Sequence, residues 1–368
     1  LVNFVDAVDY SLPKAPLHLV RCAGCGLLQL EHTTNPDLLF RTFWYRTGIN
    51  QTMREAMQDI VADGMKLHDS GVWLDIGAND GYLLSTLGDS FTKIACEPAK
   101  TFVDDLAKIA NHSINDYFSP DFDFLYDGDG NGRCDIITSA AMFYDIDEPG
   151  QFVRDIAKVL SPTGVWINQL NDSPTMMAAN AFDAICHEHL CYYDLASLEA
   201  LYRANGLEVF KVSYNDVNGG SMRVFAKKSQ SPWKPFPTTV LDVVSLEQAK
   251  QFAGRVRKWR TRMIEFLGSC REPVWLYGAS TKGAVALQYL NANYCFAGIA
   301  DRNEHKHGKY MAGAWIRIHD EEEMRRQKPE TIMVLPWAFR DEFVKRERET
   351  LDNGACMVFP LPNIEVVL

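Results

Sequence analysis

The chain has 368 residues, of which 47% are hydrophobic and 23% are charged, and its formal net charge is −11 at pH 7. A chain of this length is expected to hold two large domains, or two large domains and a small one. The acidic balance argues against a general binder of nucleic acids or membrane surfaces, because phosphate groups are bound by a basic face. No apolar stretch is as long as a membrane span, and no cleavable signal is visible.

The nine cysteines are an odd and mostly scattered set, which does not suggest a disulfide framework. We therefore expect a reducing, cytoplasmic location. The sequence begins at Leu1 rather than Met, so we expect that a segment is missing.

Residues 1–43 contain one Cys-x-x-Cys pair, Cys22 and Cys25, followed by Gly26. This arrangement is typical of a zinc knuckle, because the turn points both thiolates at one ion. One pair is only half of a tetrahedral site, and the nearest other candidate ligands are His18 and His32. Two interpretations stay open: zinc held together with a second pair from a missing N-terminal segment, or two plain buried thiols.

After a helical pattern that begins near Thr52, the segment 72–84 reads as the first strand, loop and helix of a Rossmann-like fold. The strand ends near Asp75, and the turn has Gly77 and Gly81, where backbone can approach a ligand closely. The next strand, Lys93–Cys96, ends in Glu97, a carboxylate placed to accept hydrogen bonds from both hydroxyls of a ribose.

Asn79 stands where a dinucleotide-binding loop has its middle glycine, so no pyrophosphate bed is evident. The loop therefore favours an adenosine ligand without phosphates, of which S-adenosylmethionine is the common one. A structural turn and a nucleotide site are the alternatives.

Strands and helices alternate through the rest of the chain, which predicts an α/β fold with a doubly wound sheet covered by helices on both faces. The turn Ser161–Gly164 is expected to separate a helix from the strand that follows it. The expected elements are strands Cys134–Thr138, Gly164–Gln169, Leu207–Tyr214 and Ser221–Lys227, and helices Pro149–Leu160 and Leu195–Asn205.

A second α/β domain is expected at the end of the chain. Ser229–Thr239 contains three prolines and is interpreted as a linker, and Leu246–Leu267 has the spacing of a packing helix. Val274–Gly283 then repeats the Rossmann-like start, followed by strands Phe296–Ala300 and Thr331–Leu335.

The triplet His187-Glu188-His189 lies beside two tyrosines, Tyr192 and Tyr193, in a dense group of titratable residues. In an extended segment the two imidazoles face one side and the carboxylate the other. One histidine could then act as a base while Glu188 orients or polarises a neighbour. The alternatives are a His-x-His metal site, for which no spaced third ligand is seen, and buried structural residues. General acid–base catalysis next to a methyl donor is the favoured interpretation, because methylation of a carbon atom requires removal of a proton.

Together these residues resemble the S-adenosylmethionine-dependent sugar C-methyltransferases of deoxysugar biosynthesis, over essentially the whole chain. The motifs that carry the resemblance are Cys22-x-x-Cys25-Gly26-Leu27, Asp75-Ile76-Gly77-x-Asn79-Asp80-Gly81, His187-Glu188-His189-Leu190-x-Tyr192-Tyr193, Asn218-Gly219-Gly220-Ser221-x-Arg223, Tyr277-Gly278-Ala279-Ser280-Thr281-Lys282-Gly283 and Leu335-Pro336-Trp337. The family often has Tyr at the position of Cys186 and His at that of Asp145.

The resemblance implies three parts: a partial zinc-binding module at 1–43, a class I methyltransferase (Rossmann-like) domain at 44–228, and a linker helix with a C-terminal Rossmann-like domain at 229–368. In the family this last domain carries no redox cofactor. The implied cofactors are S-adenosylmethionine, bound by Asp75, Gly77, Asn79, Gly81 and Glu97, and a structural zinc on Cys22 and Cys25.

The implied substrate is a nucleotide-linked 4-keto-deoxysugar, bound between the central and C-terminal domains. The implied base is His189, which removes the proton at C3 so that the enolate can attack the methyl group, with Glu188 and Tyr45 as supporting polar groups. Tyr45 or His187 could donate a hydrogen bond to the enolate oxygen.

Arg223 and Lys282 are the expected diphosphate partners in this acidic chain, or else surface ion pairs, and Asn218 and Ser221 are further expected substrate contacts. No partner beyond the substrate is expected, and the enzyme is expected to be a monomer. Two other classes stay open: an O- or N-methyltransferase on another small metabolite, and a non-catalytic protein that binds an adenosyl ligand.

Overall fold

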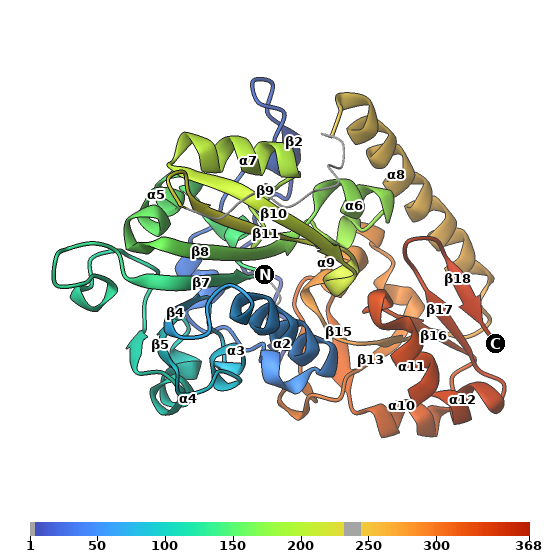
Figure 1. Cartoon of the computed structure of the whole chain (residues 1–368). Coiled ribbons are helices and arrows are strands. Elements are labelled where there is room, and N and C mark those ends of the chain that lie inside the picture. Colours follow the sequence, from blue (N-terminus) through green and yellow to red (C-terminus); the bar gives the residue numbers. More distant parts are fainter. Residues whose placement is uncertain (1–3, 232–243) are drawn as a thin grey trace. The chain divides into compact units, whose positions relative to one another are not determined.

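The computed structural model describes residues 4–231 and 244–368, and the chain divides into two compact units (Figure 1). The central unit contains residues 20–175 and 190–244, and the C-terminal unit contains residues 1–19, 176–189 and 245–368. The predicted domain ranges differ from this division at three places. Residues 1–19 of the predicted 1–43 module belong with the C-terminal unit, and residues 20–43 belong with the central unit. Residues 176–189 belong with the C-terminal unit. The chain passes for the last time from the central to the C-terminal unit at 244–245, whereas the predicted boundary is at 228–229. The predicted linker Ser229–Thr239 falls mostly outside the described residues.

The central unit is built on a sheet in which β4, β5, β6, β7 and β8 run parallel. Strand β11 is antiparallel to both β8 and β10. In sheet order the strands are β10 (Leu207–Asn215), β11 (Ser221–Lys228), β8 (Leu160–Asn171), β7 (Cys134–Ala140), β4 (Gly71–Ile76), β5 (Phe91–Cys96) and β6 (His112–Ile114). The predicted doubly wound α/β fold is confirmed.

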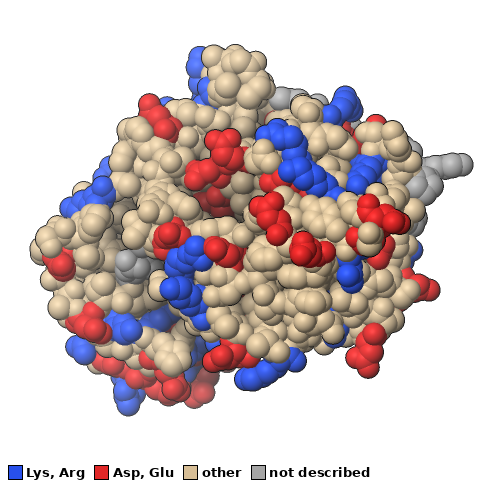
Figure 2. All heavy atoms as spheres, turned by 90° about the vertical axis from the view of Figure 1, so that its left-hand side faces the viewer, with Lys and Arg blue, Asp and Glu red and all other residues tan. Residues whose placement is uncertain are grey.

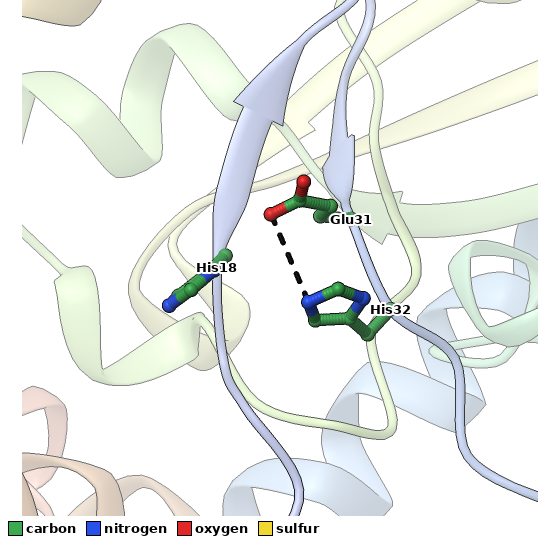
Figure 3. Close-up of side chains that lie close together, drawn as sticks. All are labelled: His18, Glu31 and His32. Atoms are coloured by element: carbon green, nitrogen blue, oxygen red, sulfur yellow. Dashed lines mark ion pairs between the residues drawn. The ribbon is translucent and has the colours of Figure 1, made fainter.

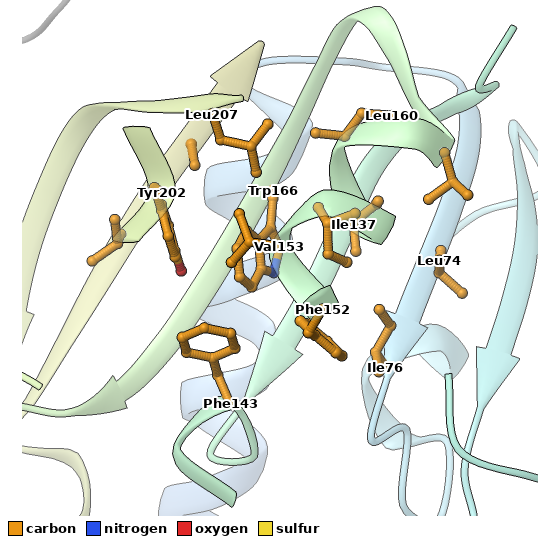
Figure 4. Packing of buried hydrophobic residues seen from close by; sticks show 14 of the residues in the cluster. Leu74, Ile76, Ile137, Phe143, Phe152, Val153, Leu160, Trp166, Tyr202 and Leu207 are labelled. Atoms are coloured by element: carbon orange, nitrogen blue, oxygen red, sulfur yellow. The ribbon is translucent and has the colours of Figure 1, made fainter. Parts of the chain in front are cut away.

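Helices cover both faces of this sheet. Alternate strand residues point to opposite sides, and both sets are apolar, so each face packs against helices. Leu74 of β4 and Trp166 of β8 pack against α5 (Pro149–Val159) and α7 (Leu195–Ala204), as Figure 4 shows. Trp73, the neighbour of Leu74, instead packs on the opposite face with residues of α2 (Gln51–Met65), α3 (Tyr82–Ser85) and α4 (Val103–Ile109).

The prediction that Ser161–Gly164 separates a helix from the next strand is wrong, because these residues lie within β8. The register of β8 against β7 passes from Cys134↔Leu160 to Ile136↔Val165, so the strand bulges where the turn was expected. Local Pro and Gly chemistry does bend the chain here, but the pairing with β7 continues on both sides of the bend.

A small three-stranded sheet joins two strands from the start of the chain to one that follows β8. It contains β2 (Leu19–Arg21), β3 (Leu28–Leu30) and β9 (Cys191–Tyr192), and β9 pairs with β3 in antiparallel register. The short helix α1 (Pro36–Phe40) follows, and α6 (Ser173–Ala178) lies where the chain passes from the central to the C-terminal unit.

The C-terminal unit has a second sheet with a parallel centre, and β12 lies between β13 and β16. In sheet order its strands are β1 (Phe4–Val5), β14 (Tyr310–Met311), β15 (Ile316–His319), β13 (Phe296–Ala300), β12 (Val274–Tyr277), β16 (Thr331–Val334), β17 (Cys356–Phe359) and β18 (Glu365–Val367). Its helices are α8 (Leu246–Ser269), α9 (Thr281–Leu290), α10 (Glu321–Gln327), α11 (Arg340–Arg346) and α12 (Arg348–Asp352). The edge strand β1 comes from the N-terminus of the chain, which local patterning did not reveal.

Within the described part of the chain, we find no helix with the length and apolar character needed to cross a bilayer. On the face drawn in Figure 2, the described Lys and Arg side chains lie among Asp and Glu rather than in one continuous basic surface.

Candidate active site

The loop after β4 has left-handed backbone conformations, which glycine and asparagine adopt more easily than other residues. Gly77 and Gly81 have φ of +73° and +75°. A Cβ on Gly81 would lie 2.9 Å from both Leu106 and Ile109, so the close packing of the loop against α4 also requires glycine there. Asn79 has φ +52°, a conformation that asparagine tolerates better than most residues.

Glu97 fastens this loop from the end of β5. Its two carboxylate oxygens accept the backbone N–H of Asn79 and of Ala99, each at 2.8 Å. Glu97 is 6% exposed, and burial raises the pKa of its carboxyl although these hydrogen bonds oppose the shift. Each oxygen still has a lone pair, so the predicted ribose contact is compatible with the geometry and stays a prediction.

Asn79 also ties a second segment to the loop. Its amide donates to the Tyr45 carbonyl at 2.8 Å and accepts the Thr47 N–H at 2.9 Å. Burial, with a smaller contribution from the charge of Asp80, raises the pKa of Tyr45 to about 12. The phenol therefore stays protonated at neutral pH and can donate a hydrogen bond, as an enolate oxygen would require.

Asp75 lies at the end of β4 and is 3% exposed. It accepts a 2.6 Å hydrogen bond from the Thr138 hydroxyl. Burial raises the pKa of Asp75 to about 7, the Thr138 hydrogen bond opposes this shift, and the nearby Glu97 carboxylate adds to it. Two buried carboxyl groups beside one glycine-rich loop suit a ligand that carries positive charge.

We expect the affinity for the cationic S-adenosylmethionine to fall as the pH is lowered through about 7, because Asp75 becomes protonated. Because the folded-state pKa of Asp75 lies above that of the unfolded chain, about 3.9, its contribution to stability is present below that value and is lost as the pH rises to about 7. Asp75→Asn should therefore bind the cofactor more weakly, while the ligand-free variant unfolds at a higher temperature than the wild type at pH 8. Titration calorimetry and thermal melts at pH 6 and 8 check both signs. A wild-type affinity that does not change between these pH values would contradict the assignment.

The predicted base lies in the C-terminal unit. The His189 Nδ1 is 2.8 Å from the carbonyl oxygen of Ala184. A carbonyl can only accept, so Nδ1 carries the proton and the lone pair is on Nε2. Burial lowers the pKa of His189 to about 4, the Lys282 charge adds to this shift, and the Glu188 charge opposes it. The imidazole is therefore neutral at cellular pH.

The two neighbours of His189 in the triplet are placed differently. His187 has its Nε2 3.1 Å from the carbonyl of Ala15, which belongs to the same unit. Glu188 is buried, at 9% exposure. Cys186, where the family often has Tyr, is also buried, and Asp145 lies in a short 3-10 helix of the central unit.

The position of Arg223 does not favour the predicted diphosphate contact. Its side chain is 2% exposed, and its guanidinium pairs with Asp63 at 2.7 Å and Asp59 at 2.9 Å, both on α2. Its Nε donates to Gln169 at 2.9 Å. All of these groups lie within the central unit, so Arg223 fixes α2 to the sheet, and a diphosphate would have to displace the mostly buried Asp63 and Gln169.

The other predicted substrate contacts lie in two places. Asn218 has φ +57° in the turn before β11, and the Ser221 hydroxyl donates to the Val217 carbonyl at 2.9 Å. Lys282 is in the first turn of α9, and its charge acts on both His189 and Asp183. No local pattern marks Asp183 as a site residue, although it lies in the same titratable segment as the triplet.

The second Rossmann-like loop is closed by the chain's own side chains. Asp301, at the position after β13 that Glu97 occupies after β5, accepts the Ala279 N–H at 2.8 Å and pairs with the buried Lys306 at 2.9 Å. Lys306 also donates to the Ala279 carbonyl at 2.8 Å. The ammonium group therefore fills the place beside this carboxylate where a ribose would be bound.

The Cys-x-x-Cys turn has the geometry of a knuckle. The Cys22 carbonyl accepts the Gly26 N–H at 3.1 Å, Gly26 has φ +84°, and hydrogen bonds from the Cys25 and Gly24 backbones lower the pKa of Cys22. Cys25 is exposed and Cys22 is partly exposed, which contradicts the interpretation as plain buried thiols.

The two histidines considered as further ligands lie next to the small sheet. His32 is paired with its neighbour Glu31 at 3.8 Å just after β3, and His18 directly precedes β2 (Figure 3). Among the described residues, no group with the spacing of a metal site includes either cysteine.

Comparison with known proteins identifies the class. Residues 49–212 match the family model "Methyltransferase domain", and residues 216–362 match "C-methyltransferase C-terminal domain". The C-methyltransferase NovU of Streptomyces niveus is 26% identical over 377 residues, which cover 96% of this chain and 87% of that protein. The chain is an enzyme of the methyltransferase class. It belongs to the S-adenosylmethionine-dependent C-methyltransferases.

Solved methyltransferases are similar over about half of the chain. A SAM-dependent methyltransferase from Aquifex aeolicus has 17% identity and a TM-score of 0.35, over 46% of this chain and 88% of that one. The magnesium protoporphyrin IX methyltransferase of Synechocystis has 10% identity and a TM-score of 0.36, over 48% and 79%.

Proposed function

We propose that this C-methyltransferase acts on a nucleotide-linked 4-keto-deoxysugar and places the methyl group on C3. The observation that carries the proposal is the state of His189, a neutral imidazole whose Nδ1 donates to the Ala184 carbonyl, so that Nε2 is the unprotonated nitrogen of the ring. A carbon acid beside a ketone needs such a base, whereas an oxygen or nitrogen nucleophile often needs less help. The similarity to the C-methyltransferase NovU supports methylation at carbon, and the motifs shared with the sugar C-methyltransferases support the choice of substrate.

In this mechanism His189 Nε2 takes the C3 proton and becomes an imidazolium, which Glu188 stabilises electrostatically. The protonated Tyr45 phenol donates to the oxygen that gains negative charge as the enolate forms. S-adenosylmethionine would be held by the loop from Asp75 to Gly81 and by Glu97. It would supply the methyl group, whose bond to sulfur would break as the bond to C3 forms, with S-adenosylhomocysteine as the leaving group. The imidazolium then returns its proton to water, so the base is regenerated.

We propose that the diphosphate of the sugar nucleotide pairs with Lys282, whose positive charge acts on His189. Pairing of Lys282 with a diphosphate would remove the charge that lowers the basicity of His189 in the ligand-free protein. Asn218 and Ser221 remain proposed sugar contacts.

The test is a panel of nucleotide-linked keto-sugars, incubated with S-adenosylmethionine in deuterium oxide and analysed by mass spectrometry and NMR. We expect a C3-methylated product from at least one 4-keto-sugar, with loss of the original C3 proton, or its exchange for deuterium when the methyl donor is omitted. A methyl group found on oxygen or nitrogen would instead support the alternative of an O- or N-methyltransferase. Binding without turnover on the whole panel would support a non-catalytic protein.

We further propose that Cys22 and Cys25 bind a structural zinc together with a second thiolate pair from a longer N-terminus. Two observations support this proposal: the turn lowers the pKa of Cys22, and both cysteines are at least partly exposed. A chain extended to include that pair should bind about one zinc, as a four-thiolate site requires. Cys22→Ser should abolish binding, and Cys270→Ser, at a partly exposed cysteine of the other unit, is the matched control. Absence of zinc from the extended wild-type chain would refute the proposal.

The location and the oligomeric state are also proposals. All nine cysteines are free thiols in the structure, which supports a reducing, cytoplasmic location. We propose that the enzyme acts there as a monomer.

A further inference from the structure

The segment 176–189, which carries the base, is anchored first by an aromatic side chain. Phe182 starts the 3-10 turn Phe182–Ala184. Its ring centroid lies 4.7 Å from that of Trp259 on α8 and 5.4 Å from that of Tyr289 on α9. This contact fixes the start of the turn against two helices of the C-terminal unit.

The second anchor is polar and lies one residue further on. Asp183 is 1% exposed, and its Oδ2 accepts the indole N–H of Trp337 at 2.8 Å. Trp337 follows β16, and Lys282, whose charge stabilises the Asp183 carboxylate, follows β12. The two strands are neighbours in the parallel sheet, so both partners of Asp183 come from the carboxyl ends of the strands where open α/β sheets bind ligands.

The third residue of the turn presents the acceptor for the base. The Ala184 N–H donates to the Ala181 carbonyl at 3.1 Å, and the Ala184 carbonyl accepts from His189 Nδ1 at 2.8 Å. The orientation of that carbonyl decides which imidazole nitrogen is protonated. Asp183 directly precedes Ala184 in the same 3-10 turn, so anchoring the Asp183 side chain to Trp337 restrains the turn from which the Ala184 carbonyl projects.

We propose that Asp183 is a positioning residue for the methyl transfer: through its hydrogen bond to Trp337 it holds the Ala184 carbonyl that keeps His189 in the Nδ1–H tautomer. The inference rests on the proposed role of His189 as the base. It assigns a function to a buried carboxylate and a tryptophan that lie 154 residues apart and do not themselves contact the reacting carbon.

The proposal is tested on the full chain with Asp183→Ala, Asp183→Asn and Trp337→Phe. Tyr277→Phe is the matched control, because Tyr277 also donates to a buried carboxylate of the same unit, Glu347, at 2.9 Å. Each variant is compared by thermal melting, by kcat and KM, and by the nitrogen NMR shifts of histidine-labelled, ligand-free protein, with the His189 signal identified from its loss in His189→Asn.

We expect Asp183→Ala and Trp337→Phe to lower kcat by about ten- to a hundredfold, the usual scale for a misplaced catalytic group. KM for S-adenosylmethionine should be unchanged, and the NMR signal of His189 should move toward a mixture of tautomers. Asp183→Asn retains an acceptor for Trp337 and should restore most of kcat and the Nδ1–H signal. Tyr277→Phe should lose thermal stability with kcat within about twofold of the wild type.

Three results would overturn the proposal: an unchanged His189 signal in Asp183→Ala and Trp337→Phe, a kcat loss in Tyr277→Phe as large as theirs, or no rescue by Asp183→Asn. If Asp183→Ala does not fold, the other two variants still decide. Failure of the proposed function is distinguishable, because it would leave the tautomer change in NMR intact while the wild type methylates no keto-sugar.

Discussion

Replacing His189 with asparagine is expected to lower turnover by about two to four orders of magnitude, the range that a general base contributes. Asparagine can place its amide nitrogen near the position of Nδ1 and keep the bond to the Ala184 carbonyl. It offers no lone pair at the position of Nε2. The variant therefore removes the base while it preserves the contact that orients it.

The measurements are kcat with a keto-sugar accepted by the wild type, and the dissociation constant for S-adenosylmethionine. The dissociation constant should change little, because Glu97 and the cofactor loop belong to the central unit. His307→Gln is the control, since His307 also contacts a backbone carbonyl of the C-terminal unit, that of Asp301 at 2.6 Å, and has no proposed role. Wild-type turnover in His189→Asn would mean that another group takes the proton, with His187 and Tyr45 the next candidates.

Structural features that depend on residues near one another in the chain are predictable from the sequence. The loop from Asp75 to Gly81 and the carboxylate at Glu97 follow from glycine spacing and the ends of two adjacent strands. The role of Glu97 was only partly foreseen, because its two hydrogen bonds to the backbone of Asn79 and Ala99 depend on how the loop folds back on β5. The same holds for the bulge in β8, where pairing with a distant strand prevailed over local turn chemistry.

Features that depend on contacts between distant residues were missed. The segment 176–189 follows the methyltransferase sheet in the chain, yet it packs with α8, α9 and the end of β16, about 80 to 150 residues later. No local pattern marks Trp337 as the partner of Asp183. A buried acidic residue within a titratable cluster was the one available signal, and it pointed to the region without identifying the partner.

Arg223 was predicted to bind the substrate because its ion-pair partners on α2 lie far from it in the sequence, where no local pattern reveals them. We expect Arg223→Met to destabilise the protein by about 3 kcal/mol, because it leaves Asp63 in a mostly buried position without its closest cation. Lys66 at 3.0 Å and Lys211 at 3.5 Å still pair with Asp63, which keeps the loss near the lower end of the range for broken buried pairs.

A loss of this size should lower the melting temperature by about 6–12 °C for a domain of this size. Asp59→Asn is the matched control: it removes the other ion pair of the same guanidinium, but the Asp59 side chain is 67% exposed, so the pair is worth no more than about 1 kcal/mol. Thermal melts of the two variants, with KM for the sugar nucleotide, separate the two roles of Arg223. A variant that melts like the wild type but binds the sugar nucleotide much more weakly would restore the diphosphate assignment. A lower melting temperature with KM unchanged would establish that Arg223 holds α2 on the sheet and leave Lys282 as the cation for the phosphates.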